Sequence, residues 1–235
     1  MEITFGVCGT AGRNEDGRRL SKEHFEAMCV VTNELINTCA ELNYKITTLV
    51  SGASAWADHS CVKLFLDKKV PRLRLFLPTE FDRGSFKDIG VKDPTLNPGG
   101  TMNYYHKKFQ VATHINSLSQ IQIARVEGAE LIPIAGGLYA RNAMVARSDF
   151  LLAITFGNGS QVKANSGSAH CVKCYLDRVK KTGMFDKSFH YDLNEGKIYE
   201  GCTLPPKKEH AFLDTRTRAV VSNFLGKHVP SWKKP

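Results

Sequence analysis

The sequence lacks the long apolar run that a membrane-spanning helix needs. Such a helix takes about 20 consecutive apolar residues, and no segment of this 235-residue chain approaches that length. Residues 3–8 already have the pattern of a strand, so a secretory signal is not expected either. We therefore expect a cytoplasmic protein, or a nuclear one, without a membrane partner.

Paired cysteines and the common catalytic motifs are also missing. The seven cysteines are scattered and odd in number, which suits a reducing compartment better than a disulfide framework. Cys171 and Cys174 form a single CxxC, and no second CxxC or HxxxH completes the roughly four ligands of a zinc site. No G-x-S-x-G, HExxH or Walker A sequence is present. The sequence thus predicts neither a metal nor a cofactor.

Acidic residues are fewer than basic ones. The chain has 32 Lys and Arg against 23 Asp and Glu, which gives a formal net charge of +9 at pH 7. Such a charge attracts polyanions and anionic small molecules, but it says nothing about fold. A nucleotide pocket and a nucleic-acid surface both fit the charge, and so does a plain excess of surface lysine.

Strand-like and helix-like segments alternate along the chain. Helical spacing of apolar residues predicts helices after Ser21, from Ala57 to Phe65, and at 104–126, 138–147 and 166–181. Strands are expected at 3–8, 46–50, 72–77, 131–134, 149–155 and 188–193. This alternation is typical of an α/β fold with a doubly wound, mainly parallel Rossmann-like sheet and helices on both faces. We predict one such domain over residues 1–202.

Two segments fall outside this alternation. Residues 79–103 show no periodic pattern and are rich in Gly, Pro and charge, so they are predicted to be a long loop, either a lid over the site or a plain excursion. Residues 203–235 form a basic C-terminal extension with a short helix at about 209–225. The extension either docks on the domain and frays, or acts as a basic arm toward nucleic acid or a partner chain.

Four glycine turns, each directly after an apolar strand, give the strongest indication of a ligand. They follow the strands that end near residues 8, 50, 134 and 156. The carboxyl ends of parallel strands form the ligand crevice of such a sheet. Glycine there lets backbone N–H groups approach a phosphate, and the next helix adds a dipole that favours an anion. The turns therefore indicate a nucleotide or another phosphorylated ligand.

Three of these segments carry a family resemblance. Residues 50–58 (VSGASAWAD), residues 136–144 (GGLYARNAM) and residues 150–159 with 166–170 (SGSAH) resemble motifs of a Rossmann-like superfamily. That superfamily includes the DNA-processing protein A, the lysine-decarboxylase-like LOG proteins and the ADP-ribose-sensing SLOG domains. The resemblance spans roughly residues 3–193 and implies a nucleotide-binding pocket. His170 stands where enzymatic members tend to carry the acid implicated in breaking a base–sugar bond, so it argues against that chemistry.

The candidate ligand-binding residues come from the glycine turns and the helix starts that follow them. Each has a structural alternative: a turn for the glycines, a surface residue for Arg13, a helix-dipole partner for Asp58 and an N-cap for Ser166. We expect Arg141 to reach a phosphate and Asn142 a ribose or base edge. The full set is Gly9, Thr10, Arg13, Gly52, Asp58, Gly137, Arg141, Asn142, Gly157, Gly159, Ser166, Gly167 and Ser168.

These residues leave several functions open. The first is binding of a nucleotide or nucleotide-derived ligand, with hydrolysis of its N-glycosidic bond as an added activity for which Asp58 and Glu80 are the nearest carboxylates. The alternatives are a non-enzymatic sensor or sequestering protein with the same pocket, and a single-stranded nucleic-acid binder. The resemblance and the long apolar helix expected at 104–126 also predict a homo-oligomer.

Overall fold

A seven-stranded sheet forms the centre of the molecule in the computed structural model, which describes residues 3–205. The strands lie in the order β6-β3-β2-β1-β7-β8-β9, and every neighbouring pair is parallel except β8 with β9. The strands are β1 (Thr4–Gly9), β2 (Thr48–Ser51), β3 (Arg72–Leu77), β6 (Glu130–Pro133), β7 (Phe150–Thr155), β8 (Ser188–Asp192) and β9 (Lys197–Glu200). The predicted mainly parallel α/β fold is confirmed.

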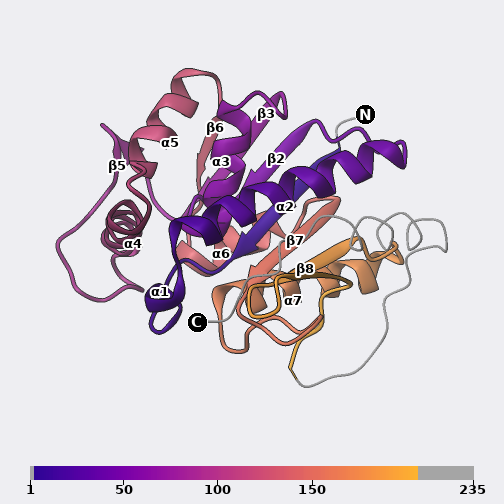
Figure 1. Cartoon of the computed structure of the whole chain (residues 1–235). Helices are drawn as coiled ribbons and strands as arrows, with labels where there is room; N and C mark the ends of the chain where they lie inside the picture. The colour runs from indigo at the N-terminus through magenta and orange to yellow at the C-terminus, as the bar shows by residue number, and fades with distance from the viewer. Residues whose placement is uncertain (1–2, 206–235) are drawn as a thin grey trace.

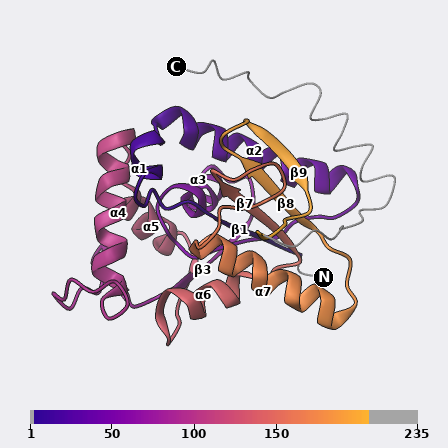
Figure 2. The same cartoon turned by 90° about the horizontal axis from the view of Figure 1, so that it is seen from below.

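Helices cover both faces of this sheet, because each central strand is apolar on both sides. Along β7, Leu152 and Ile154 pack into one core while Leu151 and Ala153 pack into the other, as the two-residue repeat of a strand requires. One face carries α2 and α3, with α4 and α5 beyond them, and the other carries α6 and α7 (Figures 1 and 2). The helices are α1 (Asp16–Arg19), α2 (Lys22–Glu41), α3 (His59–Leu66), α4 (Pro98–Thr113), α5 (Ser117–Val126), α6 (Gly137–Val145) and α7 (Gly167–Thr182).

The winding direction of the sheet reverses at β1. The chain proceeds from β1 to β2, β3 and β6 on one side, and α6 then returns it to β7, which pairs with β1 on the other side (Figure 1). In open α/β sheets a ligand crevice forms outside the carboxyl ends of the strands at such a switch point. The fold therefore places the crevice between the ends of β1 and β7.

The single helix expected at 104–126 is two helices. His114 takes a left-handed conformation (φ 61°) at the end of α4, and the next helix begins after Asn116, whose side chain accepts a hydrogen bond from the Ser119 N–H at 3.0 Å. An N-cap of this kind starts a new helix, although the apolar spacing runs on through the break. The prediction of one helix was wrong for this reason.

The loop expected at 79–103 contains more structure than its composition suggests. Strands β4 (Phe81–Asp82) and β5 (Ser85–Phe86) form a small hairpin around Arg83 and Gly84. Helix α4 begins already at Pro98, with Asn97 accepting the Gly100 N–H at 3.0 Å. Proline fits the first turn of a helix because its missing N–H would be unpaired there anyway. The irregular part is thus reduced to residues 87–97.

Several further differences lie at the edges of the fold. Helix α1 and strand β9 were not predicted, because each is only four residues long. Thr203, placed in the predicted extension, donates its N–H to the Ser160 carbonyl at 2.9 Å. The predicted helix at 209–225 and the basic end of the chain lie outside the described residues. Within residues 3–205, no helix is long and apolar enough to cross a membrane.

Candidate functional site

A cavity of about 350 Å³ lies at the switch point of the sheet. Its walls come from the loops after β1, β2, β6 and β7, and from the segment that precedes α4. Eleven of the residues that line it were predicted from the sequence: Gly9, Thr10, Arg13, Gly52, Asp58, Gly137, Arg141, Asn142, Ser166, Gly167 and Ser168. The structure thus brings together predicted residues that are far apart along the chain. Gly9 and Ser168, the first and the last of them, are 159 positions apart.

The loop after β1 is tied closely to its neighbours. A Cβ atom on Gly9 would lie 2.2 Å from the Ile154 carbonyl oxygen and 2.5 Å from the Ala57 Cβ, so only glycine fits there. The next residue, Thr10, donates its hydroxyl to Asp16 at 2.9 Å and its N–H to the Ile154 carbonyl at 2.9 Å. Gly9 and Thr10 therefore hold the ends of β1 and β7 at a fixed separation beside the cavity.

Lys163 and Asp16 connect the loops on the two sides of the switch point. The Lys163 Nζ lies 2.6 Å from Asp16 Oδ1, and the Lys163 N–H is bonded to the Thr155 hydroxyl at 3.2 Å. The Asp16 side chain is 8% exposed, whereas that of Lys163 is 40% exposed. Both line the cavity. A cation that is still partly open to solvent therefore stands at its rim.

Arg141 lies in the wall of the cavity, but it is more deeply buried than the sequence suggested. Its Nη2 donates to the Ser54 hydroxyl at 2.8 Å, and its Nη1 donates to the Gly52 carbonyl. The residue is 6% exposed, and its Nε has no partner among the described residues. Arg141 therefore joins the middle of α6 to the turn after β2.

Asp58 faces the same turn from the other side. Its Oδ2 accepts the N–H groups of Gly52 at 3.1 Å and Ser54 at 3.2 Å. A Cβ atom on Gly52 would lie 2.9 Å from this oxygen and 2.9 Å from the Arg141 Cζ. Because glycine has no side chain, the carboxylate of Asp58 and the guanidinium of Arg141 can both pack against this turn. The Asp58 side chain does not cap α3. It orders the loop after β2 instead.

The charges of Asp58 and Arg141 are both affected by burial. Burial raises the pKa of Asp58 to about 6, against the opposing effects of the Arg141 charge and the backbone N–H bonds. Burial also lowers the pKa of Arg141, and the Asp58 charge opposes that change. The ionised forms of Asp58 and Arg141 thus stabilise each other, because burial disfavours the charge of either group alone.

The first turn of α7 forms the opposite wall. Ser166 is its N-cap and accepts the Ala169 N–H at 3.0 Å, while its hydroxyl donates to the Lys163 carbonyl at 2.7 Å. Asn142 fixes this turn to α6, since its Nδ2 donates to the Gly167 carbonyl at 2.9 Å. Ser166 therefore acts as an N-cap, which was the structural alternative to a ligand-binding role. The N-terminus of a helix of 16 residues still points its dipole at the cavity.

Some predicted residues lie elsewhere. Gly157 and Gly159 belong to a turn against β8, where the Gly159 N–H is bonded to Asp192 at 3.0 Å, and neither lines the cavity. Glu80 is paired with Lys87 at 3.2 Å on the surface. His170 packs its ring on Tyr139 at 4.8 Å, one turn from the half-buried Cys174. Within residues 3–205, no group of three or more His, Cys, Asp or Glu is arranged to hold a metal ion.

The sequence did not identify four cavity residues that matter for its chemistry. Asp16 and Lys163 lie outside the segments from which the candidate residues were taken. Ser54 lies in the turn after β2, and its hydroxyl accepts a hydrogen bond from Arg141 at 2.8 Å. Thr95 comes from the loop expected at 79–103. Only the repeated clustering of polar residues next to glycine turns could have indicated the first three.

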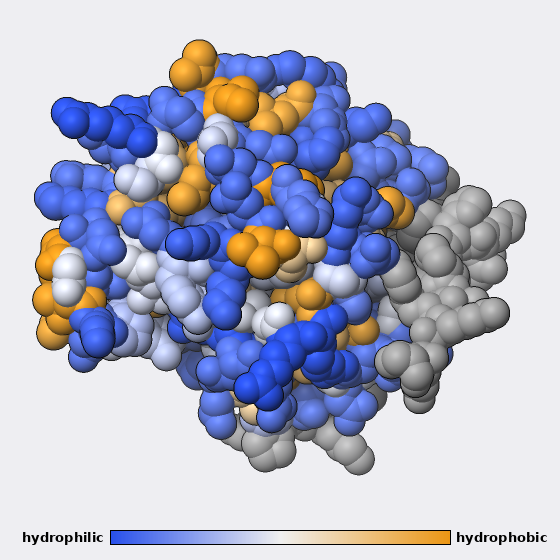
Figure 3. All heavy atoms as spheres, turned by 60° about the vertical axis from the view of Figure 1, so that its left-hand side comes forward, coloured by the Kyte–Doolittle hydropathy of each residue, from blue (hydrophilic) through white to orange (hydrophobic). Residues whose placement is uncertain are grey.

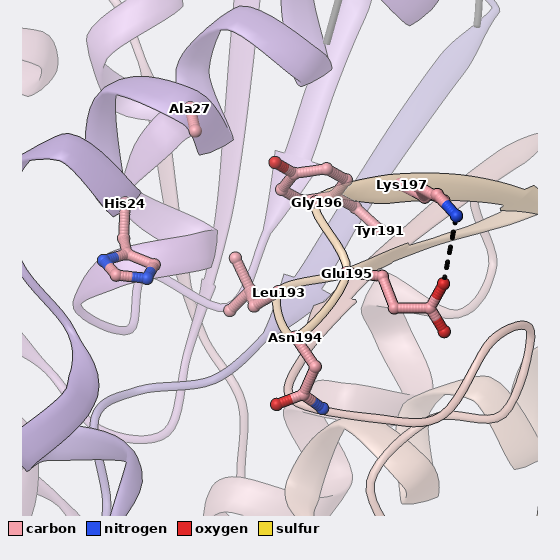
Figure 4. A pocket seen from close by; sticks show the side chains of 8 residues that line it. All are labelled: His24, Ala27, Tyr191, Leu193, Asn194, Glu195, Gly196 and Lys197. Atoms are coloured by element: carbon pink, nitrogen blue, oxygen red, sulfur yellow. Dashed lines mark ion pairs between the residues drawn. The ribbon is translucent and has the colours of Figure 1, made fainter. Parts of the chain in front are cut away.

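A second, smaller cavity has a different character. It measures about 270 Å³ and lies between α2 and the turn that joins β8 to β9, lined by His24, Tyr191, Asn194 and Lys197 among others (Figure 4). Glu195 is paired with Lys197 at 3.5 Å inside it. No predicted site residue lines this cavity, and its charges are matched within it, so the switch-point cavity is the candidate site.

The comparison with known proteins gives one relative at high similarity. An uncharacterized protein of Acanthamoeba polyphaga mimivirus is 40% identical to this chain over 157 residues, which make up 66% of this chain and 83% of the viral protein. The chain belongs to the same family as that viral protein. No protein-family model matches the chain.

Proposed function

We propose that the switch-point cavity binds a nucleotide or a nucleotide-derived ligand. The observation that carries this proposal is the position of Arg141, Lys163 and the first turn of α7 around one cavity between the ends of β1 and β7. Cations and a helix N-terminus in one place favour a phosphate. The uncharged wall at Leu138 and Tyr139 offers a surface for a base.

The family resemblance supports the same proposal. Each of the three resembling segments, residues 50–58, 136–144 and 166–170, contributes residues to this cavity. We therefore propose membership of the Rossmann-like superfamily that contains the DNA-processing, LOG and SLOG proteins. In this proposal Arg141 acts by its charge and by ordering the loop after β2, and the more exposed Lys163 makes the direct phosphate contact.

Replacement of Lys163 tests the phosphate site. Lys163→Ala should weaken binding of adenosine 5′-monophosphate about tenfold, because a hydrogen bond to a charged group contributes roughly 1.5 kcal/mol. The loss also leaves the Asp16 carboxylate facing the phosphate without its cation. Calorimetric titration measures the affinity, and adenosine without phosphate should bind equally to both proteins.

Lys173→Ala is the matched control for this experiment. Lys173 lies on α7, the helix that follows Lys163 in the chain, but it is exposed and paired with Asp177 at 2.6 Å, and it does not line the cavity. Its replacement should leave the nucleotide affinity unchanged. Equal affinity of wild type and Lys163→Ala would place the phosphate elsewhere.

Hydrolysis of the N-glycosidic bond is the second candidate function. Asp58 lines the cavity, and its pKa of about 6 keeps a share of the carboxyl group protonated near neutral pH. A carboxyl group in that state can transfer a proton to a leaving base. Release of free adenine from adenosine 5′-monophosphate would favour the enzyme, and binding without release would favour the sensor or sequestering protein.

The predictions of a lid, a homo-oligomer and a nucleic-acid partner are still to be tested. Pro94 and Thr95 reach the cavity from residues 87–97, which keeps the lid role of this segment open. A homo-oligomer is still expected from the superfamily resemblance. A single-stranded nucleic acid remains the alternative partner that the charge of +9 suggests.

A further inference from the structure

A third cavity adjoins the candidate site on the side of α4. It measures about 420 Å³ and is lined by Asp88, Lys92, Pro94, Asn97, Tyr104 and Tyr105 among others. Pro94 lines both this cavity and the switch-point cavity. Arg13, which lines the first cavity, holds its guanidinium 5.4 Å from the centre of the Tyr105 ring in the second. The two cavities are therefore neighbours.

Two tyrosine rings form the aromatic wall of this cavity. Their centroids are 5.1 Å apart in an edge-to-face arrangement, and Tyr104 is 54% exposed. The Lys108 Nζ lies 5.5 Å from the Tyr104 centroid, and Lys92 also lines the cavity. The face of the molecule that carries α4 is largely hydrophilic, with apolar residues in separate patches (Figure 3). Exposed rings with adjacent cations are the surface on which proteins stack bases and bind the linking phosphates.

The part of the wall that comes from residues 88–97 is held in place by hydrogen bonds within the chain. Asn97 is 4% exposed, accepts N–H groups from Ile89 and Gly100, and donates to Asp88 Oδ1 at 2.6 Å and to the Val91 carbonyl at 2.8 Å. Asp88 also accepts the Gly90 N–H at 2.8 Å, so this carboxylate is committed to its own loop. A fixed wall lowers the ordering cost of binding.

We propose that Tyr104 and Tyr105 stack the base of a second nucleotide unit, joined through phosphate to the nucleotide in the switch-point cavity. The inference rests on the proposed function of that cavity. Arg13 stands between the two cavities and faces the linking phosphate. A free dinucleotide and a single-stranded nucleic acid both supply this chemistry.

The experiment compares three probes by calorimetric titration: adenosine 5′-monophosphate, 5′-phosphorylated diadenylate and a longer single-stranded oligoadenylate. The diadenylate should bind wild type about tenfold more tightly than the monophosphate, in line with the strength of base stacking on aromatic rings. Tyr104→Ala should remove this gain and leave the affinity for the monophosphate unchanged. Tyr104→Phe should keep the gain, because the ring is retained.

Phe185→Ala is the control, since Phe185 is 77% exposed and lines neither cavity. Equal binding of monophosphate and diadenylate to wild type, or an undiminished gain in Tyr104→Ala, would overturn the second site and leave the first intact. Failure of wild type to bind any of the three probes would overturn the proposed function and this inference with it. A further rise in affinity for the longer strand would identify a nucleic acid as the source, and no further rise would identify a dinucleotide.

Discussion

Arg141→Ala should lower the free energy of unfolding by about 2–4 kcal/mol, because it leaves several buried groups without their partner. The Gly52 carbonyl and the Ser54 hydroxyl both lose a donor. Asp58 loses the charge that opposes the effect of burial on its pKa, so that pKa should rise above about 6. Urea unfolding at neutral pH measures the stability change.

Two further variants separate the role of Arg141 from a general effect of losing an arginine. Arg141→Lys should recover only part of the stability, because lysine lacks the planar fork that reaches two acceptors. Arg147→Ala, at an exposed position just after α6, should change the stability by no more than about 0.5 kcal/mol. A stability of Arg141→Ala equal to that of wild type would contradict the buried position of the guanidinium.

Acidification from about pH 7.5 to about pH 5 should destabilise the protein on the order of 2 kcal/mol. Burial lowers the pKa of His106 to about 3 and that of His59 to about 4. In the unfolded chain both take up a proton near pH 6.5, so stability is full above that value and falls as the pH drops toward about 4. Asp58 opposes part of the loss, because its raised pKa makes the native state bind a proton first.

Burial is the main cause of the lowered pKa values of His106 and His59, and it outweighs the hydrogen bonds to Ala53 and Gln120, which act to raise them. His106 is bonded to the Ser117 hydroxyl at 2.8 Å and to the Ala53 carbonyl at 2.9 Å, and His59 to Gln120 at 2.7 Å. His59→Phe should reduce the slope of stability against pH below pH 6.5, even if stability at neutral pH also falls. His114→Asn, at an exposed left-handed position, should leave the slope unchanged. Urea unfolding at several pH values gives the slopes, and identical slopes for wild type and His59→Phe would refute the assignment.

The mainly parallel α/β sheet with helices packed on it could be predicted from the sequence, because the alternation of strands and helices depends on local features. Apolar strands followed by glycine turns can be recognised in windows of about ten residues. The break at His114 could not be predicted in the same way, since Asn116 acts as an N-cap only once a left-handed residue has ended the helix before it. The start of α4 at Pro98 was missed because proline and two glycines outweighed the capping signal of Asn97.

Side-chain contacts in the candidate site could also be predicted only in part from the sequence. The sequence indicated that Arg141 and Asp58 would meet at one end of the sheet, and both line the cavity. It could not indicate that Arg141 would be buried against Ser54, because the two residues are 87 positions apart. The pairing of Lys163 with Asp16 is equally remote in sequence, at a separation of 147 residues. Contacts of this kind depend on how the loops pack.

A crystal structure of the protein with saturating adenosine 5′-monophosphate tests the central claim most directly. The nucleotide should lie in the switch-point cavity, with its phosphate within hydrogen-bond distance of the Lys163 Nζ and beside the first turn of α7. Nucleotide density in another cavity, or a switch-point cavity that stays empty while calorimetry in the same solution shows binding, would contradict it.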